Sequence, residues 1–577
     1  MSESSLKTHQ SISILLMRRK EQLIRVIESA RHHTHQFYWQ WVLCLILFRI
    51  VLTADFVPGA WFAPHDASLY VERAAHLVAG NELGPYNSRV LVKIPGFSFL
   101  LAAFSRWGIP YDVWILLLQI AAGLAVARGS LKFTGQPLIS VVCISLSLLH
   151  PAVWVHAFET IRETAQVGLY LALFGVTLSL SLTRSVITQF AHNLAAAFLL
   201  VIVGNIREDD FTLAPMLGMI VGVANILSLR SRQSSWSSSI AGGILSLLLS
   251  VGALIGTQYH LTQWVGERYT YARAHDLSYG AYPKLIASLR AIDSDEQSRY
   301  VMIPHSTLLR VSEHVPDFKL VTQRINRPKP LDPPCWRFDE CENWTNGYLV
   351  FWIRDAADES GLLTDPIDSR SSVRAESKFG QWAEQISRLC GTAWTCSERG
   401  HGIFWPLTSL SPTSFAYESA LGFISWIHPV RGLKKMPLDL LTDIEHVRNY
   451  YRVLGFEHKS LLSRVGGQVK QNFALQMFRE VLNYTVTFAT SLLLLYFPFK
   501  FRSRRYLKDD AHMSGKKILL FSWIAFFGVK WLALSYSAYT MGPVDDRLYF
   551  AAHIVCVLAV ILIFELERRS KPELTKE

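Results

Sequence analysis

Long apolar runs separated by shorter polar segments dominate the pattern along this chain. A helix needs about 20 apolar residues to cross the hydrocarbon core of a bilayer. Ten runs reach or approach that length, and we expect each to be a membrane-spanning helix: 37–54, 110–127, 137–150, 164–183, 187–204, 212–229, 238–257, 480–499, 518–539 and 548–565. The pattern therefore predicts an α-helical polytopic membrane protein with about ten transmembrane helices.

One further apolar run, residues 94–107, is short and opens with Ile-Pro-Gly. If this run does not span the membrane, the basic segments beside the other runs all fall on one side, as the positive-inside rule requires. Those segments are Lys7 to Arg31, Arg128 with Lys132, Arg184, Arg230 with Arg232, residues 500–517, and the tail with Arg568, Arg569 and Lys571. We therefore expect 94–107 to be the second of two juxtamembrane helices in the first external loop, after an amphipathic helix in "HDASLYVERAAHLVAG".

This topology divides the chain into four parts, with both termini cytoplasmic. They are a basic amphipathic segment (1–36), a transmembrane module (37–258) whose first external loop is 55–109, an external insert (259–479), and the last spans with a cytoplasmic tail (480–577). The insert combines helix-like stretches such as "SKFGQWAEQISRLCG" with turn-rich connectors such as "NRPKPLDPPCW". We expect it to be a mixed α/β domain.

Composition agrees with the membrane interpretation and narrows the partners. Half of the 577 residues are hydrophobic and only 18% are charged, whereas about a quarter of the residues in soluble chains are charged. The formal net charge of +11 comes from lysines and arginines that lie beside the apolar runs. The charge therefore indicates the lipid bilayer as a partner and gives no signal of nucleic-acid binding.

Four of the seven cysteines lie in the insert: Cys335, Cys341, Cys390 and Cys396. Their two matching short separations suggest the disulfides Cys335–Cys341 and Cys390–Cys396 in an oxidising compartment. Four cysteines allow three pairings, and a metal site is the other interpretation, although no spacing here matches a zinc signature.

Asp66 is the first candidate for chemistry, because it stands just outside the first span at the start of the amphipathic helix. The helix dipole favours an ionised carboxylate there. Such an Asp suits a general base that deprotonates an acceptor hydroxyl. An ordinary N-cap explains the same position equally well.

Two cations follow in "GPYNSRVLVKIPG", namely Arg89 and Lys93. Cations at the level of the headgroups commonly pair with lipid phosphates. The alternative is specific recognition of the phosphate on a lipid-linked substrate, where a guanidinium gives bidentate contacts and an ammonium gives a point charge.

Further charged residues gather in the short external loops, at the ends of spans. They are Glu159, Arg162 and Glu163 in the second loop, Arg207, Glu208, Asp209 and Asp210 in the third, and Asp545, Asp546 and Arg547 near the last span. Charges flanked this tightly by apolar residues are candidates for a protein-lined site. The acids could also bind a divalent cation, although no spacing identifies a metal site.

These residues carry a resemblance. The pattern D-x-x-x-Y-x-x-x-A-x-x-L-x-x-G from Asp66 to Gly80, followed by "GPY…K-x-PG", resembles the first external loop of GT-C glycosyltransferases. The similarity is to the branch that contains the protein O-mannosyltransferases and the bacterial aminoarabinose transferase. The pieces "ETIRE", "IRED…P" and "GYLVFWIRDAADESG" resemble a bacterial subgroup of such enzymes whose substrates are not assigned.

The resemblance implies a GT-C-like fold, a polyprenyl-phosphate sugar donor, and a site that faces outward from a bacterial inner (plasma) membrane. Carried over by position, Asp66 would be the catalytic base, Lys93 or Arg89 would meet the donor phosphate, and Glu159 would be the acid of the second loop. We add Arg207 and Arg547 as candidates for charge stabilisation. Two departures from the family pattern are His65 in place of a second acid and Glu-Thr in the second loop, where relatives often have Thr-Asp.

The function that the sequence leads us to expect is an inverting glycosyltransferase that moves a sugar from a polyprenyl-phosphate carrier to an acceptor outside the cytoplasm. The acceptor is a glycan, a lipid or a protein. The sequence identifies no cofactor with certainty, and a divalent cation could assist. Two other classes stay open: a transporter or flippase for a lipid-linked saccharide, and a non-catalytic envelope assembly protein.

Overall fold

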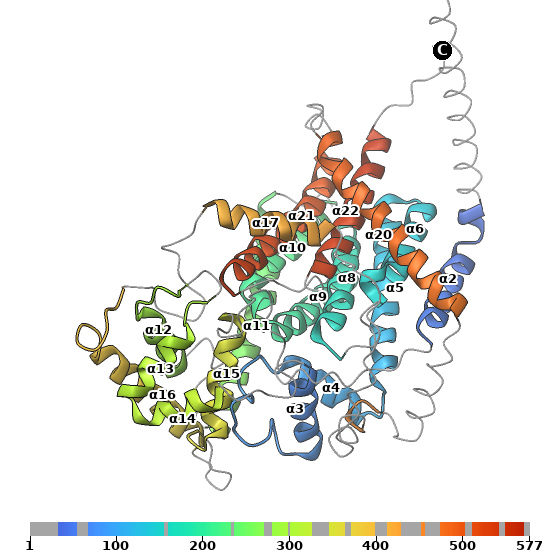
Figure 1. Ribbon diagram of the computed structural model, residues 1–577. Helices are drawn as coiled ribbons and strands as arrows, with labels where there is room; N and C mark the ends of the chain where they lie inside the picture. The colour runs from blue at the N-terminus through green and yellow to red at the C-terminus, as the bar shows by residue number, and fades with distance from the viewer. Residues whose placement is uncertain are drawn as a thin grey trace, which may run out of the picture.

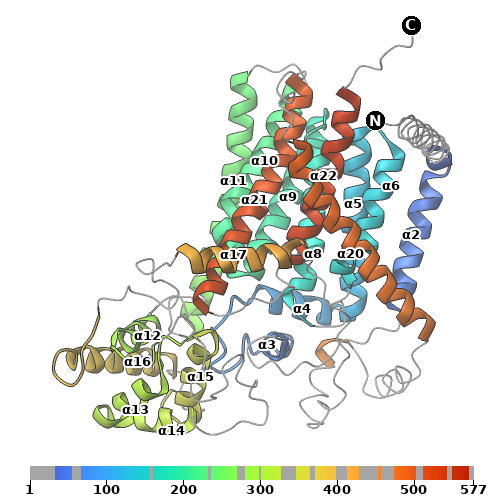
Figure 2. The ribbon, with the colours of Figure 1, turned by 45° about the horizontal axis from the view of Figure 1, so that its top comes forward.

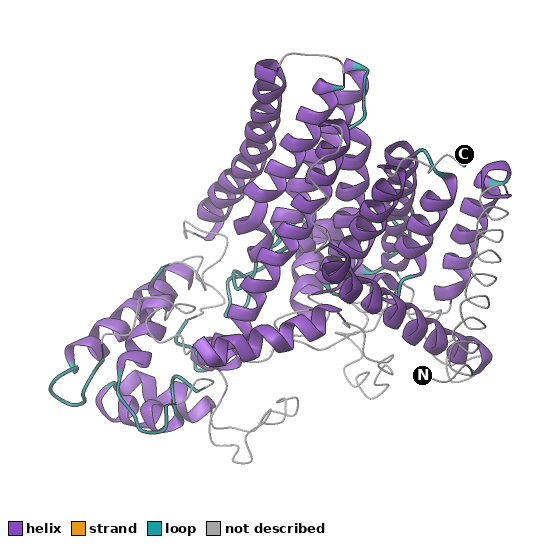
Figure 3. Ribbon diagram, turned by 90° about the horizontal axis from the view of Figure 1, so that it is seen from above, coloured by secondary structure: helices purple, strands orange, loops and turns teal. Residues whose placement is uncertain are grey.

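The chain folds into a bundle of upright helices with a smaller helical body at one end (Figure 1). The computed structural model describes residues 33–54, 67–154, 160–231, 236–269, 280–297, 301–325, 346–363, 371–397, 412–427, 452–455, 473–501, 511–541 and 549–570. Among these residues there are helices, turns and two isolated bridges, but no strand (Figure 3).

Every one of the ten predicted spans contains a helix. They are α2 (Tyr38–Thr53), α5 (Tyr111–Thr134), α6 (Pro137–Leu149), α8 (Arg162–Leu180), α9 (Val186–Ile206), α10 (Glu208–Arg230), α11 (Trp236–Tyr269), α20 (Phe473–Phe501), α21 (Ala511–Met541) and α22 (Phe550–Ser570). Seven of them, α5, α8, α9, α10, α11, α20 and α21, are long and apolar enough to cross a membrane. The prediction of an α-helical, polytopic membrane protein is confirmed, while the count of ten spans stays a prediction.

Helix α8 lies at the centre of the bundle, and almost all of its side chains are buried. It packs directly against α5, and both helices have a glycine at the contact. A Cβ atom on Gly175 would lie 2.4 Å from the carbonyl carbon of Ala125, and one on Gly129 would lie 2.6 Å from the carbonyl oxygen of Gly175. Small residues let the backbones of membrane helices approach closely. The van der Waals packing that results helps to hold the helices together in lipid.

Two short helices, α3 (Ala67–Ala79) and α4 (Gly96–Arg106), lie at one end of the upright helices and not among them (Figure 2). At 1.5 Å per residue the 11 residues of α4 extend about 16 Å, roughly half of the hydrocarbon thickness. The expected pair of juxtamembrane helices is therefore present. We call this end of the bundle the loop end.

Basic segments meet at the opposite end. The ammonium of Lys516, near the start of α21, donates to the carbonyl oxygen of Phe133 at the end of α5 (3.0 Å). At the end of α22, Arg568 and Arg569 both pair with Glu565. These described basic segments lie at one end, as the charge pattern predicts when run 94–107 does not span the membrane. Of the other basic segments, Lys7 to Arg31, residues 502–510 and Lys571 lie outside the described residues.

The insert lies beside α3 at the loop end (Figure 2). Its described elements are α12 (Ala281–Ala291), α13 (His305–His314), α14 (Pro316–Ile325), α15 (Asn346–Glu359) and α16 (Ser371–Arg388). Aromatic side chains such as Tyr282, Phe318 and Trp382 form their core. The strands expected of a mixed α/β domain do not occur in the described residues. Amphipathic helices supply most of the core, and residues outside the helices such as Ile303 and Leu363 complete it. A further helix, α17 (Pro412–Ile427), packs across α21 (Figure 2).

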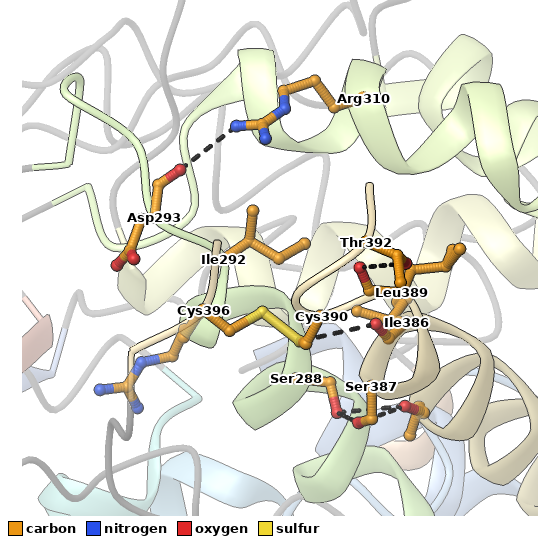
Figure 4. Close-up of a disulfide and its surroundings, with 12 residues drawn as sticks. Ser288, Ile292, Asp293, Arg310, Ile386, Ser387, Leu389, Cys390, Thr392 and Cys396 are labelled. Carbon is orange, nitrogen blue, oxygen red and sulfur yellow. Dashed lines mark hydrogen bonds between the residues drawn. A yellow bond between two sulfur atoms is a disulfide. The ribbon is translucent and has the colours of Figure 1, made fainter. Parts of the chain in front are cut away.

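The predicted disulfide Cys390–Cys396 is confirmed (Figure 4). It closes a turn that pairs with the end of α12, where Ile292 forms an antiparallel bridge with Cys396. The backbone N–H of Asp293 donates to the carbonyl of Thr395 at 3.0 Å. Cys335 and Cys341 lie outside the described residues, as does the N-terminal segment 1–32.

We predict that a bulky residue at the α5–α8 contact separates the two helices. The variant Gly175→Val places side-chain atoms where the Ala125 backbone now lies, and overpacking of this kind costs about 1–3 kcal/mol or more. The measurement is the melting temperature of the purified protein in detergent. The matched control is Gly252→Val in α11, where an added Cβ meets nothing within 4 Å. Equal melting temperatures for the two variants would contradict the proposed packing.

Candidate functional site

The linker between α3 and α4, residues 80–95, is shaped around a buried guanidinium. Arg73 of α3 is 1% exposed and donates to the carbonyl oxygens of Lys93 (2.9 Å) and Arg89 (3.0 Å). The side-chain oxygen of Asn87 accepts from the backbone N–H groups of Arg89 and Val90, at 2.9 Å each. The linker therefore has a defined path, although it contains no regular secondary structure.

The insert also holds this linker, and Ser88 is the point of contact. Its hydroxyl donates to Asp355 of α15 at 2.6 Å, and its backbone N–H donates to Asp358 at 2.9 Å. Its carbonyl oxygen accepts from Arg354 at 3.0 Å. The neighbouring Arg89 has its Nε atom 3.8 Å from the same Asp355 carboxylate.

Next to the linker lies a cluster of four charged residues, which we call the outer cluster. Arg162 pairs with Glu208 at 2.9 Å, and its Nε lies 3.5 Å from Glu163. Arg207 pairs with that same Glu163. The other oxygen of Glu208 accepts from the backbone N–H of Ile94 at 3.1 Å, so the outer cluster and the linker are joined directly.

The ends of three helices explain why these charges meet. Glu163 lies in the first turn of α8 and Glu208 in the first turn of α10, where helix dipoles favour negative charge. Arg207 alone separates α9 from α10, in an extended conformation (φ −137°, ψ 143°). Because the turn between the two spans is one residue long, its charges are held at the helix ends.

A second charged pair lies deeper in the bundle. Lys530 of α21 binds Asp210 of α10, and their side chains are 3% and 0% exposed. Tyr170 and Gln166 of α8 also donate to this carboxylate, Tyr170 at 2.7 Å. A buried carboxylate is stable only when it is paired and hydrogen-bonded, and here both conditions are met.

The sequence-predicted residues divide into those that the structure brings together and those outside its described part. Arg89 and Lys93 lie in the linker, with Arg162, Arg207 and Glu208 beside it. Asp209 lies in the first turn of α10. Asp66, Glu159 and Arg547 lie outside the described residues, and Asp66 directly precedes α3.

Lys530 and the α15 residues that hold Ser88 were not predicted as site residues. A lysine inside the apolar run 518–539 was a signal for Lys530, because ionisable residues within spans are rare and usually functional. No signal pointed to Ser88 or Asp355, since their meeting depends on how the insert docks.

The arrangement suits an anion that reaches the site from the bilayer surface. The linker that carries Arg89 and Lys93 meets the outer cluster, with Arg162 and Arg207, at the ends of apolar helices, where a lipid headgroup would lie. The carboxylates Glu163, Glu208 and Asp210 each contact a cation. No group of three or more metal-ligating side chains occurs in the part of the chain that the structure describes.

Known proteins offer few matches to this chain. No protein-family model matches it, and no curated protein sequence matches it. Among solved structures it is similar to the crystal structure of ArnT from Cupriavidus metallidurans bound to undecaprenyl phosphate. The TM-score is 0.29 and the identity 12%, over 92% of this chain and 78% of that chain.

We predict that the buried pair Lys530–Asp210 stabilises the protein only when both charges are present. Lys530→Met leaves the Asp210 carboxylate buried without its cation, a change that typically costs about 3–5 kcal/mol. The double variant Lys530→Met with Asp210→Asn removes both charges and should recover much of that loss. The measurement is the melting temperature in detergent, with Lys284→Met on the exposed face of α12 as the control. A double variant no more stable than Lys530→Met alone would contradict the coupling.

Proposed function

We propose that this integral membrane protein is an inverting glycosyltransferase that uses a polyprenyl-phosphate-linked sugar as donor and an acceptor outside the cytoplasm. The observation that carries the proposal is the junction of the α3–α4 linker with the outer cluster, through the hydrogen bond from Ile94 to Glu208 (3.1 Å). That junction brings the linker segment that carries Arg89 and Lys93 against the outer cluster, which contains Arg162 and Arg207, at the ends of membrane helices. The sequence resemblance of the linker to the first external loop of GT-C enzymes supports the same function.

The donor phosphate would lie among these four cations. A guanidinium has five N–H donors, so Arg162 and Arg207 can share theirs between a phosphate and the carboxylates Glu163 and Glu208. Those carboxylates hold the guanidinium planes in place before the substrate arrives. Preorganised charge of this kind stabilises a transition state without further rearrangement.

In the proposed reaction the acceptor hydroxyl oxygen attacks the anomeric carbon of the sugar. The bond from that carbon to the phosphate oxygen breaks, its electron pair leaves with the polyprenyl phosphate, and the configuration inverts. Asp66 takes the proton of the attacking hydroxyl. The charge that grows on the leaving phosphate is stabilised by the cations of the linker and the outer cluster. Asp66 directly precedes α3 in the sequence, and Arg73 of α3 holds the linker.

We predict that loss of either linker cation weakens binding of the lipid phosphate. Arg89→Gln and Lys93→Gln each remove one charge-assisted contact while leaving the outer cluster intact, so the Kd for undecaprenyl phosphate should rise about 10-fold or more. The measurement is titration of the full-length protein in detergent. The control is Arg388→Gln, an exposed arginine at the end of α16. Wild-type affinity in both linker variants would count against the phosphate site.

We predict that the proposed base, Asp66, is needed for activity in cells. In cells that lack the gene, Asp66→Asn at the wild-type membrane level should fail to restore the envelope glycan, because loss of a general base costs about 10²–10⁴-fold in rate. The measurement is mass spectrometry of extracted glycans and lipid-linked sugars, with Asp295→Asn on the insert surface as the control. Accumulation of one lipid-linked sugar together with loss of one glycan sugar would identify the substrate. Full complementation by Asp66→Asn would reduce that residue to a helix cap.

A further inference from the structure

The contact between the insert and the α3–α4 linker is built around one residue, Ser88, which is 4% exposed. All three of its polar groups are used by α15: the hydroxyl by Asp355, the backbone N–H by Asp358 and the carbonyl by Arg354. Two of the three partners are carboxylates and the third is a guanidinium, so each of these hydrogen bonds is charge-assisted and stronger than a neutral one.

Arg354 connects this contact to the interior of the insert. Its guanidinium is 1% exposed and stands over the rings of Tyr282 (5.1 Å) and Phe379 (5.7 Å), which belong to α12 and α16. Three helices of the insert therefore fix the position of the group that holds the carbonyl of Ser88. The contact is rigid on the insert side.

Ser88 is followed directly by Arg89, whose Nε lies 3.8 Å from Asp355. From there to Ile94 the linker is held by Arg73 and by Glu208. The bundle therefore fixes the end of the linker next to α4, and the insert fixes the end next to Ser88. The position of Arg89 depends on both attachments.

We propose that α15 is a positioning element of the donor-phosphate site: Arg354, Asp355 and Asp358 hold Ser88 and thereby fix Arg89 within the linker that joins the outer cluster at Ile94. The inference rests on the proposed function for its ligand, a polyprenyl phosphate. It assigns the insert a part in donor binding, in addition to any part in access of the acceptor.

The test compares Asp358→Ala with Asp358→Asn in the full-length protein in detergent. The alanine variant removes the acceptor for the Ser88 N–H, whereas the amide oxygen of asparagine still accepts it. Ser88→Ala removes the hydroxyl contact independently. The control is Asp317→Asn in α14, an insert carboxylate that pairs with Lys378, away from the linker.

Two quantities are measured. The first is hydrogen–deuterium exchange of linker amides such as that of Val92, which now donates to the Arg89 carbonyl at 3.1 Å. The second is the Kd for undecaprenyl phosphate. We expect Asp358→Ala and Ser88→Ala to speed exchange in the linker and to raise the Kd about 10-fold, with Asp358→Asn and Asp317→Asn close to wild type in both.

The outcomes separate this inference from the proposed function. Unchanged exchange in both alanine variants means that α15 does not hold the linker, and the inference is wrong. Faster exchange with an unchanged Kd means that the linker is held but does not position the phosphate, which also overturns it. A wild-type protein that binds no undecaprenyl phosphate overturns the proposed function and the donor side of this inference, while the exchange result still decides whether α15 holds the linker.

Discussion

The guanidinium of Arg73 donates hydrogen bonds to two carbonyl oxygens of the linker between α3 and α4. The arrangement of the rest of the loop end depends on these two hydrogen bonds. A linker of this length without secondary structure has many unpaired backbone groups, each of which must find a partner when it is buried. Here a helix, a neighbouring span and the insert provide those partners. Once the linker is fixed, the segment that carries Arg89 and Lys93 lies against the charged ends of α8 and α10.

Charge balance limits what this surface can do. In a low-dielectric setting an unpaired ion is expensive, and a paired ion still loses its hydration. Carboxylates therefore alternate with cations from α8 to α10, so that each charge has an oppositely charged neighbour. Tyr170 and Gln166 donate hydrogen bonds to Asp210. The arginines are thereby restrained without being exposed to competing solvent. A ligand that brings its own negative charge meets donors whose orientation is already set.

Much of the fold could be predicted from local pattern. Apolar runs of sufficient length define helices by themselves, so all ten expected segments contain one, and the charge pattern placed α4 outside the spans. The Cys390–Cys396 pair was predictable because it is close in sequence. The insert was harder, because short amphipathic helices and turns also occur in α/β domains. Only the three-dimensional structure shows that helices supply most of the described core.

The site was predictable as a set of charges, while its pairing was not. Arg162, Arg207 and Glu208 stood out because charged residues beside spans are conspicuous. Which carboxylate meets which cation depends on helix packing, and the roles of Ser88 and Asp355 depend on docking over 267 residues of separation. Lys530 lies 320 residues from its partner, Asp210. Neither periodicity nor local spacing in the sequence predicts contacts between residues that are this far apart in the chain.

The one-residue turn at Arg207 has a consequence for the membrane itself. Helices α9 and α10 have 21 and 23 residues, or about 31 and 34 Å at 1.5 Å per residue, close to the thickness of the hydrocarbon core. With no slack between them, the two helices cannot adjust their depths separately. The thickness of the surrounding bilayer therefore sets how far Arg207 and Glu208 stand from the lipid phosphates, and lipids of different chain length would move this charged layer as one body.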